Sequence, residues 1–286
     1  MNVPVSIVIP TRNEELNLER CLRSVAWAPE VFVVDSNSTD ATCQIAKKFG
    51  ANVVQFDYKG GWPKKKNWAL ANLPFQHKWV LLLDADEALR DGGGEEIDRV
   101  LKSGSDVAGY WINRRFMFLG KWLKHAYHPN WNLRLFEHAL GRFERLVEGE
   151  THSGDVEIHE HLAVRGKTAR LKTELEHYAF PSVESFIEKH NRYSNWESQL
   201  EWELDSKPKA SRLQDHRVDL RRRLKLFSKK LPMRPLLRFS YIYFVQRGFL
   251  DGIEGYYFAQ LHACYEWMSL VKSFERARNE NRRLGN

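Results

Sequence analysis

An apolar run ends abruptly in carboxylates at Val80-Leu81-Leu82-Leu83-Asp84-Ala85-Asp86-Glu87. A short, continuous apolar run is typical of a strand that is buried on both faces of an α/β sheet. Ligands of such sheets bind just beyond the carboxyl ends of the strands. Asp84 and Asp86 stand two residues apart, so on an extended chain their side chains face the same way and can share one hard cation. Because two carboxylates repel a diphosphate unless a divalent metal bridges them, the pattern predicts a metal and a nucleotide here. Taken alone, it also fits an Asp that only caps a helix or forms a turn.

Two earlier apolar segments end in the same way. Residues 5–9 lead into Pro10-Thr11-Arg12-Asn13-Glu14, and residues 31–34 lead into Asp35-Ser36. Helical patterns follow both loops, at 16–25 and 43–49. Repeated strand–helix units of this kind indicate a parallel sheet with covering helices, whose polar strand ends gather on one edge. The sequence also predicts strands at 52–56 and 108–112 and helices at 66–71 and 95–102.

The chain is long enough for one large domain or for a domain with an extension. It has 286 residues, of which 43% are hydrophobic, so a full core is possible. We expect an α/β domain over 1–180, with nucleotide binding in 1–115 and a region of short strands and loops in 116–180. A helical, basic and aromatic extension is expected over 181–286.

Cysteine usage and the start of the chain indicate the compartment. The three cysteines are scattered without a Cys-x-x-Cys pair, which argues against a disulfide framework or a zinc site and fits a reducing environment. The chain opens directly on a strand, without a charged and then apolar leader, so export is not expected. No apolar window reaches the roughly 18 residues that span a bilayer. We therefore expect a soluble or peripherally attached protein.

The net charge of +7 is concentrated in one stretch. Residues 206–236 contain eleven lysines and arginines, opposed by Asp215 and Asp219. Such a run is attracted to nucleic acid, anionic lipid headgroups or phosphorylated glycans; a solvated linker is the alternative. The aromatic-rich stretch 237–270, with Gly248, Gly252 and Gly255 on one helical face, predicts a helical pair that lies on a membrane. The alternative is an ordinary aromatic helix packed on the catalytic domain.

Four motifs stand in the order found in family 2 glycosyltransferases: residues 6–14, residues 33–42, Lys66-Asn67 and Asp84-Ala85-Asp86. The chain resembles that family. The resemblance implies the GT-A fold, a Rossmann-like mixed sheet with helices on both faces, and inverting, metal-dependent sugar transfer. Later motifs resemble the WaaE-type lipopolysaccharide core branch, whose members act at the cytoplasmic face of the bacterial inner membrane: 114–115, 118–122, 132–136, 158–161, 177–178 and 248–252.

The resemblance also implies roles for individual residues. Asp84 and Asp86 would hold the ribose and a Mg²⁺ or Mn²⁺ ion, and Lys66 would reach a phosphate as a mobile charge. The metal would stabilise the departing diphosphate. Ser36 stands where many relatives have a second acid, so that acid's contact to the base would be either lost or replaced by the Ser36 hydroxyl. The remaining residues expected around the base and ribose are Pro10, Thr11, Arg12, Glu14 and Asp35.

On the acceptor side, inversion needs one carboxylate that acts as a base. We expect this base to be Glu160, in Ile158-His159-Glu160-His161, with nearby acids as competitors: Glu148, Glu150, Asp155 and Glu157. Arg115 and Arg134 are expected to clamp phosphate or an acceptor carboxylate, with surface ion pairs as the alternative.

Two further groups of side chains carry alternatives to this view. His152, His159 and His161 could form a metal cluster, although they lack a cysteine partner. The tryptophans at 111, 122 and 131 could stack on sugar rings or serve only in packing.

The resemblance implies a transferase that moves a hexose such as glucose from a nucleotide-sugar, a UDP-sugar by expectation, to a lipid-linked or lipopolysaccharide-core glycan. We expect it in the cytoplasm, peripherally attached to the anionic inner-membrane surface. No nucleic acid partner is expected, because strand-end acids repel phosphates when metal is absent. The alternatives are a non-enzymatic binder of anionic membrane or nucleic acid and a metal-dependent nucleotidyltransferase.

Overall fold

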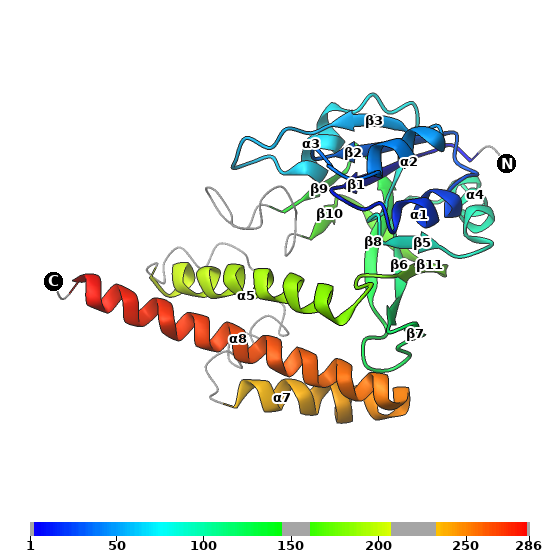
Figure 1. The fold of residues 1–286 in the computed structure, drawn as a ribbon. Helices are drawn as coiled ribbons and strands as arrows, with labels where there is room; N and C mark the ends of the chain where they lie inside the picture. The colour runs from blue at the N-terminus through cyan, green and yellow to red at the C-terminus, as the bar shows by residue number, and fades with distance from the viewer. Residues whose placement is uncertain (1–2, 145–160, 207–232, 285–286) are drawn as a thin grey trace. The chain divides into compact units, whose positions relative to one another are not determined.

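A computed structural model describes residues 3–144, 161–206 and 233–284. The chain divides into two units (Figure 1). The first comprises Met1–Trp122 and His128–Ala179, and the second comprises Leu123–Tyr127 and Phe180–Asn286. The division after Ala179 lies one residue before the expected domain boundary. The short segment Leu123–Tyr127 interrupts the first unit, which sequence patterns alone do not indicate.

A nine-stranded mixed sheet forms the first unit, and its first half is parallel. The parallel strands stand in the order β3 (Asn52–Gln55), β2 (Glu30–Asp35), β1 (Val5–Thr11), β4 (Trp79–Leu82). These are the apolar runs that the sequence indicates as strands. Burial on both faces explains why β1, β2 and β4 read as continuous apolar runs, whereas β3, at the edge of the sheet, is only partly buried.

The second half of the sheet comes largely from residues that sequence patterns describe as irregular. From β4 the order continues with β8 (Trp131–Glu137), β6 (Val107–Phe118), β11 (Lys167–His177) and β5 (Glu87–Leu89), and β7 (Lys121–Trp122) pairs with β6. Only β6 and β11 run parallel here; the other pairings are antiparallel. A separate hairpin joins β9 (Gly141–Phe143) to β10 (Leu162–Val164).

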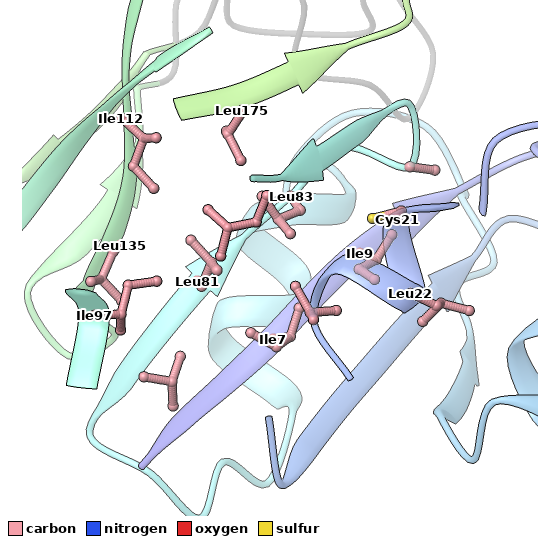
Figure 2. Packing of buried hydrophobic residues seen from close by; sticks show 14 of the residues in the cluster. Ile7, Ile9, Cys21, Leu22, Leu81, Leu83, Ile97, Ile112, Leu135 and Leu175 are labelled. Atoms are coloured by element: carbon pink, nitrogen blue, oxygen red, sulfur yellow. The ribbon is translucent and has the colours of Figure 1, made fainter. Parts of the chain in front are cut away.

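Helices cover both faces of the sheet. Along each central strand, successive residues therefore point into two different buried clusters, one on each face. Ile7, Leu81 and their neighbours pack with residues of α1 (Leu18–Ser24), α2 (Thr42–Lys48) and α4 (Gly93–Lys102), as Figure 2 shows for part of this cluster. Val8 and Leu82 face the other way and pack with α3 (Lys65–Asn72). The expected α/β class, with a mixed sheet and helices on both faces, is confirmed.

The second unit is helical. In it α5 (Val183–Ser206) and α7 (Arg234–Ser240) both pack against α8 (Gly252–Leu284). A π-helical turn, η2 (Tyr241–Val245), continues α7, and a 3₁₀ turn, η3 (Gly248–Asp251), leads into α8. In the part of the chain that the structure describes, no helix is both long enough and apolar enough to cross a membrane.

The expectation of one helical face bearing three glycines is wrong, because the chain reverses direction between them. Gly248 lies in η3, and Gly252 begins α8 with a φ of 74°. A Cβ atom on Gly255 would lie 2.0 Å from the carbonyl oxygen of Gly248. Glycine is therefore required at 255 for the close approach of the two arms of a hairpin.

A buried carboxylate fixes the inserted segment within the second unit. Asp251 is 3% exposed and accepts hydrogen bonds from the backbone N–H groups of Lys124, His125 and Ala126, at 2.8 to 2.9 Å. These bonds lower the pKa of Asp251 although its burial raises it. Loop 123–127 is thereby tied to the turn between α7 and α8.

Candidate functional site

The ends of β2, β1 and β4 lie side by side in the sheet, and each carries one of the expected site residues. Thr11 is the register partner of Asp35, and Val8 is the partner of Leu82, which ends β4 two residues before Asp84. The predicted gathering of the acidic strand ends follows from this order.

Asp35 is fully buried at the end of β2 and is held by hydroxyl and amide donors. Thr11 Oγ1 donates to its Oδ1 at 3.0 Å, and the backbone N–H of Ser38 donates to its Oδ2 at 2.8 Å. Burial raises the pKa of Asp35, but the hydrogen bonds from Ser38 and Thr11 outweigh it and lower the pKa. Asp35 is therefore an ionised acceptor at neutral pH.

Two loops beyond these strands are joined by side-chain to backbone hydrogen bonds. Asn13, at a φ of 56°, donates its N–H to Ser38 Oγ and accepts from the N–H of Thr39, at 2.8 and 2.9 Å. The N–H of Glu14 donates to Thr42 Oγ1 at 2.8 Å. Of the remaining expected residues, Pro10 is half-buried within β1, while Arg12 and Ser36 lie on these two loops and are exposed and buried.

Three consecutive lysines open α3 and are all buried. Lys64, Lys65 and Lys66 are 1%, 3% and 7% exposed. Lys65 Nζ donates to the carbonyl oxygen of Thr11 at 2.7 Å, and Lys66 Nζ donates to Asp84 Oδ1 at 2.7 Å. Adjacent lysines thus contact the ends of two neighbouring strands. Sequence reasoning missed Lys64 and Lys65, although three lysines after a glycine-rich loop were a usable signal.

Asp84 is held between two cations. Arg134 Nη2 lies 2.6 Å from Asp84 Oδ2, on the side opposite the Lys66 contact, and 2.6 Å from Glu87 Oε1. Burial raises the pKa of Asp84, but Arg134 and Lys66 together hold that pKa well below its usual value. Arg134 is only 6% exposed, so the surface ion pair considered for it is wrong. Its guanidinium binds the strand-end carboxylates.

Arg115 lies elsewhere in the first unit. Its Nε donates to Glu174, and its guanidinium lies 4.0 Å from the ring centroid of Trp122. Arg170 lies over Trp131 in the same way, at 4.6 Å. One face of each of these two rings is therefore covered by an arginine.

Asp86 has an imidazole beside it that sequence reasoning missed. His177 Nε2, at the end of β11, lies 3.5 Å from Asp86 Oδ1, and both side chains are about one-eighth exposed, 12% and 13%. The N–H of Tyr178 donates to the carbonyl oxygen of Asp86 at 2.8 Å, which fixes this end of β11 against it.

These side chains fit a divalent cation only when a substrate completes the shell. Over the described ranges, no three His, Cys, Asp or Glu side chains converge as a metal cage. The Asp86 carboxylate and the His177 imidazole, with Asp84 two residues earlier in the chain, are suitable donors for Mn²⁺ or Mg²⁺, and Mg²⁺ in particular takes one or two carboxylates together with phosphate and water oxygens. The donor set therefore fits a metal that arrives with a diphosphate.

Several expected residues lie outside the described residues. They include Glu160 and its competitors Glu148, Glu150, Asp155 and Glu157, together with His152 and His159. His161 is described and is exposed just before β10.

Comparisons with known proteins show the family of this chain. The model of glycosyl transferase family 2 matches residues 6–155. An uncharacterized glycosyltransferase of Rickettsia typhi, RT0209, is 28% identical over 94% of this chain and 86% of its own length. The lipopolysaccharide core biosynthesis glycosyltransferase LpsC of Rhizobium meliloti is 25% identical over 96% of this chain and 93% of its own length. Among solved structures, S. aureus TarS (residues 1–349) is 17% identical, with a TM-score of 0.42 and 90% of each chain covered. By the extent of the family match, the chain belongs to glycosyl transferase family 2.

Proposed function

We propose that this glycosyltransferase moves a hexose such as glucose, with inversion, from a UDP-sugar to a lipid-linked or lipopolysaccharide-core glycan at the cytoplasmic face of the inner membrane. The observation that carries the donor half is that Asp35 ends β2 and Asp84 follows β4, on either side of β1, while Lys66 of α3 contacts Asp84. Similarity to LpsC over nearly the whole of both chains supports the acceptor class.

The donor's nucleoside would lie over the ends of β1 and β2. Asp35 is ionised and rigidly held, so it can accept hydrogen bonds from a base or a ribose. The loop residues Pro10, Thr11, Arg12, Glu14 and Ser36 would surround it. Lys66 would transfer one of its donors from Asp84 to a diphosphate oxygen when the donor binds.

The metal would be held by Asp86 and Asp84, and His177, 3.5 Å from Asp86, would be a further ligand. When bound, Mg²⁺ or Mn²⁺ supplies charge neutralisation for the departing diphosphate. Arg134 and Lys66 keep Asp84 ionised, and each binds one of its oxygens, so Lys66 would have to release Oδ1 before that oxygen could face the cation.

On the acceptor side, Glu160 would take the proton of the attacking hydroxyl. The acceptor oxygen forms a bond to the anomeric carbon while the bond from that carbon to the diphosphate oxygen breaks, and its electron pair leaves with the nucleoside diphosphate. One carboxylate on the acceptor side suffices for this displacement. Arg115 would position an acceptor phosphate or carboxylate, provided that it is released from Glu174.

The test is nucleotide release by the purified full-length protein with a panel of sugar nucleotides, Mn²⁺ or Mg²⁺, and a lipopolysaccharide-core acceptor. We expect UDP to form only when acceptor, metal and one UDP-sugar are all present. Release of pyrophosphate would instead identify a nucleotidyltransferase. Salt-sensitive polyanion binding without turnover, unchanged by Asp86→Ala, would identify a non-enzymatic binder.

A further inference from the structure

The turn between α7 and α8 exposes large apolar side chains to solvent. Six of them, 48% to 69% exposed, define what we call the tip patch: Leu236, Tyr241, Phe244, Val245, Leu250 and Ile253. They lie within 18 consecutive residues, 236–253, on four successive elements of the second unit. Apolar side chains that gather on a surface in this way mark a site of interaction with a protein or a membrane.

The patch stands on a rigid support. On the other side of the hairpin Ile242 and Phe258 are 1% and 0% exposed, and Gly255 touches the backbone of Gly248. Asp251 is bonded to three backbone N–H groups of loop 123–127. Because the apolar side chains cannot fold inward onto a core that is already filled, their exposure belongs to the fold.

The charges within the patch are complementary to an anionic surface. Residues 236–253, all of them described, include one acid, Asp251, and its carboxylate is buried. Arg247 is exposed at the turn itself, and Arg238 keeps 34% of its side chain exposed beside Glu266. The sequence that leads into α7, residues 207–232, carries ten lysines and arginines against two aspartates.

We propose that the tip patch is the membrane-docking surface of this protein, and that Phe244, Val245 and Leu250 enter the headgroup boundary of an anionic bilayer. Apolar and aromatic side chains flanked by basic residues are the composition of helices that lie in this interface. A symmetric dimer through the patch would bring the same basic surfaces together, which like-charge repulsion opposes. The proposal rests on the membrane-bound acceptor of the proposed function.

The test is flotation of the full-length protein with vesicles, without any sugar donor. Vesicles of phosphatidylcholine alone are compared with vesicles that also contain phosphatidylglycerol. We expect the wild type to bind the anionic vesicles, and Phe244→Asp with Val245→Asp to weaken that binding by about tenfold or more. The matched control is Leu16→Asp with Leu119→Asp, which places the same two charges on leucines of the first unit that are 74% and 49% exposed, and it should bind as the wild type does.

Each remaining outcome decides the matter. Equal flotation of wild type and double variant, or no flotation of the wild type, overturns the proposal. A wild type that is dimeric without lipid, beside a monomeric double variant, reassigns the patch to self-association. If the double variant does not fold, Leu250→Ser with Ile253→Ser replaces it. Vesicle binding without sugar transfer would refute the proposed function alone, and transfer to a soluble acceptor without vesicle binding would refute the docking surface alone.

Discussion

Lys66 Nζ lies 2.7 Å from Asp84 Oδ1, and this ion pair joins the first turn of α3 to the end of β4. Lys66 is 7% exposed, so its ammonium is poorly solvated. In the proposed function this ammonium would lie next to the donor diphosphate. A buried ammonium bound to one carboxylate can exchange that partner for a phosphate with little change in solvation.

Lys66→Met should therefore weaken binding of UDP far more than binding of uridine. We expect a loss of about tenfold or more for the diphosphate, the usual size of one charge-assisted hydrogen bond. Calorimetric titration of both ligands in the presence of Mn²⁺ measures this difference. Lys48→Met, at an exposed position in the last turn of α2, is the control that should leave both affinities unchanged. Equal losses for UDP and uridine would show that Lys66 acts only in folding.

Asp86→Asn should remove metal-dependent turnover while the fold is retained. The substitution keeps the size of the side chain but removes the charge that binds the cation, so we expect turnover to fall about a hundredfold or more. Nucleotide release over a range of Mn²⁺ concentrations is the measurement, with Asp91→Asn, exposed before α4, as the control. If Asp86→Asn were as active as the wild type at the same Mn²⁺ concentrations, Asp86 would not be part of the metal site.

His177→Ala tests the imidazole that sequence reasoning missed. We expect weaker Mn²⁺ binding, by about 10- to 100-fold, with a smaller change for Mg²⁺, because imidazole is a better ligand for transition metals than for Mg²⁺. Metal titrations of the wild type and the variant in the presence of UDP give both constants. An equal loss for both metals would mean that His177 only positions Asp86.

Arg134→Met should destabilise the first unit. Glu87 is fully buried and Arg134 bridges it to Asp84, so removal of the guanidinium leaves buried carboxylates with less compensation, at a cost of about 3 kcal/mol or more. Lys78→Met is the matched control. Lys78 pairs with Glu137 but its side chain is 70% exposed, so loss of this ion pair should lower the free energy of unfolding by less than about 1 kcal/mol. Urea unfolding of both variants decides between these values.

The sequence predicts those parts of this site that rest on local pattern. Asp35, Asp84 and Asp86 follow apolar runs directly, so their place at one sheet edge follows from strand order alone. Lys65 and His177 contact partners 54 and 91 positions away, and no local pattern encodes such a pairing. Strand β8 and the second half of β6 were likewise obscured, because aromatic and charged residues there mask the two-residue period, whereas the first half of β6 was predicted at 108–112. Burial of Arg134 depends on two carboxylates that only the folded sheet brings to it.

Stability should fall as the pH drops from about 6.5 towards 4, because two buried histidines stay neutral in the folded state. Burial lowers the pKa of His190 to about 4 and holds that of His262 well below its usual value. The unfolded chain binds protons in this window and the folded chain does not, so His190 alone should cost about 2 kcal/mol at pH 5. Asp84 acts in a different window, since its lowered pKa contributes stability that is lost only at more acidic pH.

Urea midpoints at about pH 7 and pH 5 measure this effect. His262→Phe removes one of the two titrating groups, and its ring fits a site already lined by Tyr127 and Phe258. The variant should lose less stability on acidification than the wild type does. His138→Phe, in the first unit, is the control and should follow the wild type. Parallel pH dependence in all three proteins would contradict the assignment.

Glu160→Gln should reduce the rate of transfer and leave donor binding intact. An amide is nearly the same size as the carboxylate but takes no proton from the acceptor hydroxyl, so kcat should fall by about 10²- to 10⁴-fold. The Kd for UDP with Mn²⁺ should not change, because that affinity depends on the strand-end residues of β1, β2 and β4. Glu157→Gln is the matched control three residues earlier in the same segment. If Glu157→Gln carried the rate loss instead, the base would be Glu157. If Glu160→Gln weakened UDP binding and turnover to the same extent, Glu160 would act in donor binding, and the base would lie elsewhere.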